Sequence, residues 1–138
     1  MILETIHDPR DIKTLNDSQT QLLCTELREF LLKNVSKTGG HLASNLGAVE
    51  LTVAIHRVFD TSRDRLVFDV GHQSYAHKLV TGRLGIFDTL RQYKGMSGFP
   101  KAAESAYDVH PSGHASDSVS VALSLIHISE PTRLGMIS

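Results

Sequence analysis

The segment that decides the fold is Leu66-Val67-Phe68-Asp69-Val70-Gly71-His72-Gln73-Ser74-Tyr75-Ala76-His77-Lys78. Its first five residues are apolar except for Asp69, which predicts a short strand buried on both faces. Gly71 then permits a sharp turn, and the residues that follow are polar. Because ligands bind beyond the carboxyl ends of strands in open α/β sheets, this junction is a predicted site. An ordinary strand–turn–helix junction with surface polar residues is the alternative interpretation.

The composition of the chain excludes several classes of function. The chain has 138 residues, of which 41% are hydrophobic, so it is globular and forms one domain or part of one. A net charge of −1 without a Lys/Arg-rich run argues against nucleic acid as the main partner. We find no signal peptide and no membrane span, and the single cysteine, Cys24, fits a reducing compartment. We therefore expect a cytoplasmic protein without a membrane partner.

The first predicted helix begins near residues 16–18 and ends at Gly39-Gly40. Ser18 and Gln21 have the spacing of a capping box. Apolar residues recur every three or four positions and predict one buried face, made of Leu23, Leu27, Phe30 and Leu31. The charged residues off this stripe predict a solvated face, made of Glu26, Arg28, Glu29 and Lys33.

The second predicted helix runs from about Ala48 to Phe59, with Ser44 or Asn45 as its cap. Its predicted buried face consists of Leu51, Ile55, Val58 and Phe59. His56 flanks this stripe, and we assign it a structural role.

The rest of the chain offers little further regular structure. A short helix is predicted over about residues 74–80, and residues 95–112 form a long loop, which in a compact domain is functional or mobile. Ser112-Gly113-His114-Ala115-Ser116 then opens a helix whose N-terminus suits phosphate. A sheet cannot consist of one strand. The predicted fold class is therefore an incomplete α/β fold, mostly helical with one clear strand, in a truncated chain.

Histidines in loop-like settings carry the candidate chemistry: His41, His72, His77, His110 and His114. Their spacings do not favour a metal site, and neither an HExxH motif nor a second cysteine is present. A serine-hydrolase elbow is absent as well. Three of the five follow a glycine directly, and a diphosphate-bearing cofactor with a small carbonyl substrate would use such turns.

The chain resembles the 1-deoxy-D-xylulose-5-phosphate synthase family at four motifs that fall in the family's order. These are residues 36–47, residues 69–78 continuing to Thr81-Gly82-Arg83, then Gly98-Phe99-Pro100, and last Gly113-His114-Ala115-Ser116. The resemblance covers about residues 5–123 and implies an N-terminal fragment with a transketolase-like, thiamine-diphosphate-binding fold. It assigns residues 1–123 to the N-terminal part of that domain. Residues 124–138 do not resemble the family and are interpreted as an artefactual tail.

The resemblance also implies an activity. Members of the family condense pyruvate with glyceraldehyde 3-phosphate and release CO2. The product, 1-deoxy-D-xylulose 5-phosphate, feeds isoprenoid, thiamine and pyridoxal synthesis. They are homodimeric transferases that use thiamine diphosphate and Mg2+.

By motif, His41 is the implied catalytic acid/base near the substrate and the thiazolium. His72 contacts the cofactor diphosphate or the substrate phosphate, and Gly113, His114 and Ala115 line the diphosphate. Tyr75, His77 and Lys78 match the motif but receive no individual role.

Two parts of the family's machinery have no counterpart in this sequence. These are the Gly-Asp-Gly magnesium motif with its later Asn, and the glutamate that activates the cofactor's aminopyrimidine. We therefore assign no metal ligand and expect this fragment alone to be inactive. Two alternatives stay open: an N-terminal piece of another thiamine-diphosphate enzyme of transketolase type, or a His-rich metal-binding module.

Overall fold

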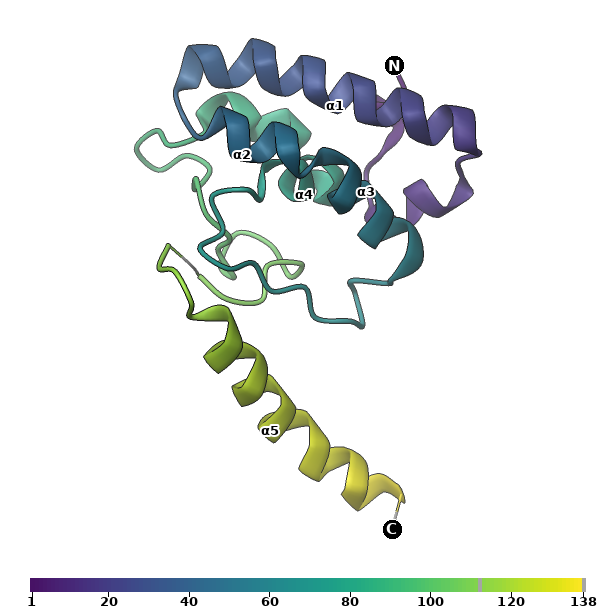
Figure 1. Ribbon diagram of the computed structural model, residues 1–138, viewed down its shortest axis with the longest axis vertical. Helices are drawn as coiled ribbons and strands as arrows, with labels where there is room; N and C mark the ends of the chain where they lie inside the picture. Colours follow the sequence, from purple (N-terminus) through teal and green to yellow (C-terminus); the bar gives the residue numbers. More distant parts are fainter. Residues whose placement is uncertain (112, 138) are drawn as a thin grey trace.

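A computed structural model describes the backbone of residues 1–111 and 113–137 and the side chains of residues 1–111 and 113–127. Over this range the chain is mostly helical (Figure 1). The α-helices are α1 (Asp17–Thr38), α2 (Leu42–Gly47), α3 (Val49–Val58), α4 (Tyr75–Lys78) and α5 (Ser118–Ile137). Short helices of other pitch are η1 (Leu3–Thr5), η2 (Pro9–Thr14), η3 (Leu79–Arg83) and η4 (Leu84–Thr89).

The start of α1 shows why the helix begins where it does. Asn16 Oδ1 accepts the backbone N–H of Gln19 at 2.8 Å, and Gln19 Oε1 accepts that of Asn16 at 2.9 Å. This reciprocal pair satisfies two amides that the first turn leaves without helical partners. The prediction of a box at Ser18 and Gln21 is wrong by two residues, whereas the predicted end at Gly39, with φ +78°, is confirmed.

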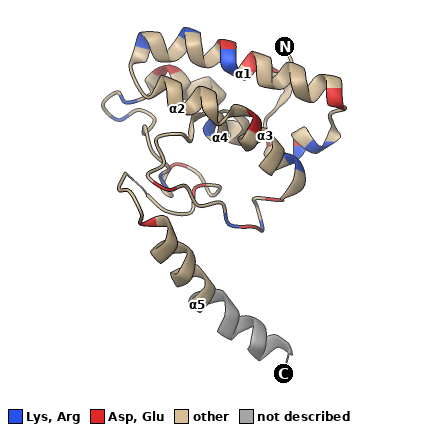
Figure 2. Ribbon diagram, viewed as in Figure 1, with Lys and Arg blue, Asp and Glu red and all other residues tan. Residues whose placement is uncertain are grey.

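The buried face of α1 follows the predicted period, with one exception among the charged residues. Leu23, Leu27 and Leu31 are fully buried, as the spacing predicts. Glu26 is buried too, so its assignment to a solvated face is wrong. Its carboxylate accepts the backbone N–H groups of Ile2 and Leu3 at 3.0–3.3 Å and thereby fastens the N-terminal arm to α1. The other charged residues of α1 begin with the acidic Asp17 and end with two lysines, Lys33 and Lys37, near the C-terminal end of the helix (Figure 2).

Helix α3 buries a different face from the one predicted. Leu51 is 65% exposed and Val58 72% exposed, whereas Val53 and His56 lie in the interior. The reason is that α3 carries apolar residues on two sides, and its packing against α1 and η2 selects the other side. Its N-cap is Ala48, so the prediction that Ser44 or Asn45 caps it is also wrong.

The predicted strand over Leu66–Val70 is not formed. Residues 65–68 have no regular secondary structure, and the described part of the chain contains no strand. The physical reason is that a strand is defined by its ladder, and these residues have no partner with which to make one. The expectation of a mostly helical chain is confirmed, and that of one clear strand is corrected.

The core lies between α1, α3 and the helical run α4–η3–η4, and its largest apolar side chains are Tyr75 and Phe87. Figure 1 shows α4 enclosed by the other helices while α5 extends away from them. The predicted long loop, residues 95–112, lies within the longer interval between the end of η4 at Thr89 and the start of α5 at Ser118. No helix in the described residues has both the length and the apolarity required to cross a membrane.

Candidate functional site

Two of the three predicted glycine–histidine turns meet in space. His41 stands immediately before α2 and His72 shortly before α4. Their ring centroids lie 4.9 Å apart with the planes tilted by 54°. The ring of Phe99, from the long loop, lies 6.2 Å from that of His41. Three segments distant in sequence therefore contribute rings to one site.

Both turns need unusual backbone. Gly40 has φ +142°, and a Cβ added there would lie 2.8 Å from Tyr75 Oη. Ahead of His72, Gly71 has φ +89° and Val70 has φ +63°. A β-branched residue in the left-handed region costs on the order of 1–3 kcal/mol and persists only where its surroundings enforce it. The turn that presents His72 is therefore a strained one.

The electrostatic surroundings of His41 favour its neutral form. Partial desolvation lowers the pKa of His41, and the proximity of the His72 ring and of the Arg91 guanidinium lowers it further. A neutral imidazole is able to accept a proton near neutral pH. His41, to which the resemblance assigns an acid/base role, is therefore available as a base.

The third predicted turn is placed differently. Gly113, His114 and Ala115 are exposed and precede α5. This segment is attached near the other turns through Ser118, whose Oγ–H donates to Asp69 Oδ1 at 2.9 Å. Among the contacts of the described residues, none joins the His114 ring to His41 or His72. The structure thus brings together two of the predicted site histidines, His41 and His72, and leaves His114 without a contact to either ring.

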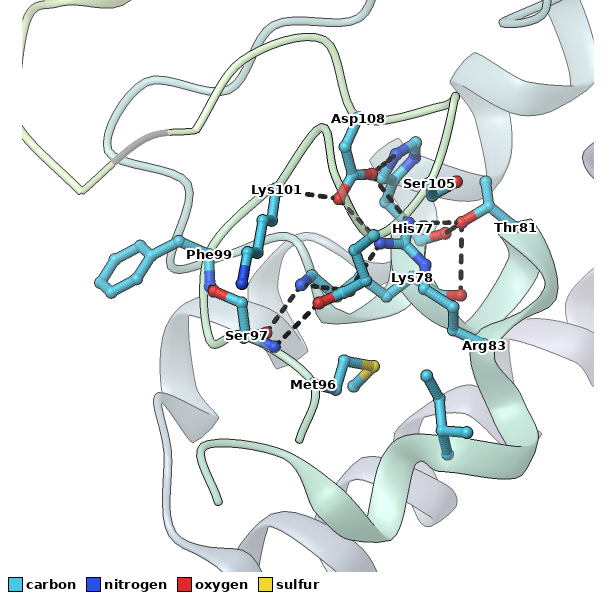
Figure 3. A network of polar contacts seen from close by, with 12 residues as sticks. His77, Lys78, Thr81, Arg83, Met96, Ser97, Phe99, Lys101, Ser105 and Asp108 are labelled. Atoms are coloured by element: carbon cyan, nitrogen blue, oxygen red, sulfur yellow. Dashed lines mark hydrogen bonds and ion pairs between the residues drawn. The ribbon is translucent and has the colours of Figure 1, made fainter. Parts of the chain in front are cut away.

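A buried ionic cluster, which we define as His77, Lys78, Arg83, Glu104 and Asp108, fastens the long loop to α4 and η3 (Figure 3). Lys78 Nζ donates to Ser97 O at 2.7 Å and to Glu104 Oε1 at 2.8 Å. Arg83 donates to both carboxylate oxygens of Asp108 at 2.7 and 2.8 Å. Two cations thus face two anions, which compensates for removing four charges from water.

Sequence reasoning found the cluster only in part. Lys78 and Arg83 lie within quoted motifs, but Glu104 and Asp108 come from a loop without periodicity and carry no local signal. Burial alone would raise the pKa of Asp108, but hydrogen bonds from Arg83 and His77 hold it well below its usual range. Burial lowers the pKa of Lys78, with Glu104 opposing the shift. The cluster therefore has a structural role: it holds the long loop against α4 and η3 through buried ion pairs.

A second histidine pair extends the cluster into the core. His56 Nε2 and His77 Nδ1 are 2.9 Å apart, His77 Nε2 is 3.1 Å from Asp108 Oδ1, and Thr61 Oγ1 is 3.3 Å from His56 Nδ1. Because a carboxylate only accepts, His77 donates from Nε2 and accepts at Nδ1. His56 therefore donates from Nε2 and accepts from the Thr61 hydroxyl. When both rings are neutral, each donor in the series from Thr61 through His56 and His77 to Asp108 has an acceptor.

Burial explains why both rings stay neutral. Desolvation is the main reason that the pKa of His56 is lowered to about 3, and the proximity of His77 and of the Lys13 ammonium lowers it further. Desolvation also lowers the pKa of His77, although the hydrogen bond and the negative charge of Asp108 act to raise it. The structural role predicted for His56 is supported by its complete burial, and its partners come from parts of the chain that spacing could not connect.

Metal binding finds no support in the geometry. Within residues 1–111 and 113–127, no three His, Cys, Asp or Glu side chains lie close enough together to hold an ion.

Comparison with known proteins gives a consistent match. The family model described as 1-deoxy-D-xylulose-5-phosphate synthase matches residues 3–133. The chain is 55% identical over 125 residues to the 1-deoxy-D-xylulose-5-phosphate synthase of Brevibacillus brevis, which covers 91% of this chain and 20% of that protein. It is 58% identical over 124 residues to the synthase of Dechloromonas aromatica, covering 90% of this chain and 20% of the relative. The chain therefore spans about a fifth of the length of the curated relatives it matches.

Proposed function

The chain belongs to the 1-deoxy-D-xylulose-5-phosphate synthase family, and on this premise we propose that it forms the N-terminal part of a transketolase-like, thiamine-diphosphate-binding α/β domain. In this proposal residues 1–123, which carry the four motifs, belong to that domain. Residues 124–138 are proposed to lie outside it, although the family model's match continues to residue 133. A strand at residues 66–70 would then form only when the rest of the sheet is present to pair with it.

The proposed reaction is that of the complete enzyme. It condenses pyruvate with glyceraldehyde 3-phosphate, releases CO2 and yields 1-deoxy-D-xylulose 5-phosphate for isoprenoid, thiamine and pyridoxal synthesis. The enzyme is proposed to be a cytoplasmic homodimer. The name shared by the relatives and the family model supports the proposed reaction.

The observation that carries the proposed site is the meeting of the His41 and His72 rings, 4.9 Å apart. Two imidazoles on tight glycine turns offer N–H donors at close range, which fits the oxygens of a diphosphate or a carbonyl group. His72 would hold the diphosphate, assisted by Gly113, His114 and Ala115. His41, which is kept neutral, would accept or return a proton at the reacting centre.

Thiamine diphosphate, when bound, would supply the nucleophilic carbon and the electron sink for decarboxylation. No cluster of three His, Cys, Asp or Glu side chains lies among the described residues, so they supply no complete set of protein ligands for Mg2+. We assign no step and no ligand to the metal in this chain.

The proposed cofactor site is tested by titrating the 138-residue chain with thiamine diphosphate while imidazole resonances are followed by NMR. The expected result is a saturable shift of the His41 and His72 signals, which thiamine without its diphosphate does not cause. His41→Ala and His72→Ala should each weaken the binding at least tenfold.

His7→Ala is the matched control, because His7 is exposed, as His41 is, but lies just before η2 and in neither glycine–histidine turn. It should leave the affinity unchanged. Equal, non-saturating shifts at His7 and His41 would contradict a built site for the cofactor.

A further inference from the structure

Asn45 is fully buried between the two histidine turns. Its Nδ2 donates to His41 O at 2.6 Å and to His72 O at 2.7 Å. Its Oδ1 accepts the backbone N–H of Tyr75 at 2.8 Å. One side chain therefore bonds to both turns and to the first residue of α4.

The orientation of this amide follows from its partners. The carbonyl oxygens of His41 and His72 only accept, and the Tyr75 amide only donates, so Nδ2 and Oδ1 cannot be exchanged. Both donor hydrogens and one acceptor position are used. Asp of the same shape lacks the two donors, and Leu lacks all three groups, so either would leave buried backbone groups unpaired.

The main chain of His41 is held on its other side as well. His41 N–H donates to Tyr75 Oη at 3.3 Å, and that hydroxyl fits against Gly40, where a Cβ would lie only 2.8 Å away. The His41 peptide is thus bound through its carbonyl by Asn45 and through its amide by Tyr75. The His72 carbonyl, which follows the strained Val70-Gly71 turn, has Asn45 as its partner.

We propose that Asn45 is a positioning residue that sets the spacing and tilt of the His41 and His72 rings. The inference about ring geometry stands by itself, and only the role of the two rings in cofactor binding and proton transfer rests on the proposed function. The amide joins the main chains of the two turns directly, so its loss leaves each turn to its own torsional preferences. The strained turn before His72 would then relax, because among the described residues no other hydrogen bond joins the His72 carbonyl to the His41 turn.

The test compares Asn45→Ala with Asn34→Ala in the 138-residue chain. Asn34 is the matched control, because its Nδ2 also donates to the carbonyl four residues earlier, Phe30 O at 2.8 Å, but it lies on α1 and touches neither histidine turn. Two NMR readouts are followed: the nuclear Overhauser contact between the His41 and His72 rings, and the pKa of His41.

In Asn45→Ala, the ring contact should disappear and the pKa of His41 should rise, because both the packing around His41 and the neighbouring His72, which lower this pKa, are disturbed. In Asn34→Ala both readouts should remain as in the parent chain. A folded Asn45→Ala variant with an unchanged ring contact and an unchanged His41 pKa would overturn the proposal.

A measurement on the unsubstituted chain keeps the proposal testable if Asn45→Ala fails to fold. The Asn45 side-chain amide protons should show contacts to both turns and exchange slowly with solvent, as buried, doubly bonded protons do. Fast exchange would overturn the proposal. None of these readouts requires thiamine diphosphate to bind, so failure of the proposed function and failure of this inference are distinguishable.

Discussion

The buried, hydrogen-bonded pair His56 and His77 predicts that the protein loses stability in mild acid. His56 and His77 are both hydrogen-bonded as neutral rings, and protonating His56 would convert its acceptor Nδ1 into a donor facing the Thr61 hydroxyl. The folded state therefore resists protonation of His56, whereas the unfolded chain accepts the proton near pH 6.5. A folded-state pKa below the unfolded value gives stability that is complete above pH 6.5 and declines as the pH falls toward 3.

The size of the effect follows from the pKa of about 3 in the folded chain. Between pH 7.5 and pH 5.0 the unfolded chain gains nearly one proton at His56 that the folded chain does not bind. At 1.36 kcal/mol per pH unit this lowers the free energy of unfolding by about 2 kcal/mol. The lowered pKa of His77 acts in the same direction. Asp108 contributes little in this window, because its unfolded pKa of about 3.8 lies below it.

The assay is urea denaturation followed by circular dichroism at pH 7.5 and pH 5.0. His56→Gln keeps an N–H donor toward His77 Nδ1 but cannot be protonated. Its stability at pH 7.5 should be lower by about 1–2 kcal/mol, yet its loss between the two pH values should shrink by about 2 kcal/mol. His7→Gln, on an exposed histidine, should keep the full pH difference of the parent chain.

Two results would refute this reasoning. One is a parent chain that is equally stable at pH 7.5 and pH 5.0. The other is a His56→Gln variant that keeps the parent's full pH difference, which would place the responsible protonation elsewhere.

Three further outcomes are expected. Lys78→Met should cost about 3 kcal/mol in denaturant unfolding, since it breaks a buried ion pair, whereas Lys37→Met on the exposed end of α1 should change stability by less than about 0.5 kcal/mol. Gly40→Ala should lower the melting temperature and cost about 1–3 kcal/mol, because its Cβ would collide with the Tyr75 hydroxyl, while Gly47→Ala, with nothing within 4 Å, should be neutral or stabilising. The 138-residue chain alone should release no CO2 from pyruvate and glyceraldehyde 3-phosphate with thiamine diphosphate and Mg2+ present, and release above a protein-free blank would contradict that expectation.

Local features of the chain were predictable because they depend on neighbours in sequence. The period of Leu23, Leu27 and Leu31 identified the buried side of α1, and Gly39 identified its end. The glycine–histidine turns were recognisable because positive φ is a property of single residues, and Gly40 and Gly71 both adopt it. The motifs indicated the family for the same reason, since they are short strings of adjacent residues.

The faces and partners of these elements depend on the tertiary structure. Both sides of α3 have apolar residues, so periodicity alone could not decide that Val53 rather than Leu51 would be buried. Asn45 looked like a helix cap, because nothing local reveals that two carbonyls and one amide from other turns converge on its side chain.

By itself, then, the sequence determined where α1 runs and ends, where the chain turns, and which family it resembles. Only the tertiary structure decided which charged side chains are buried. Lys78 and Asp108 are buried because partners 26 and 25 residues away in the chain, Glu104 and Arg83, neutralise them. Such pairing depends on distance in space, and a carboxylate in a loop has the same local pattern whether it ends in solvent or against a buried cation.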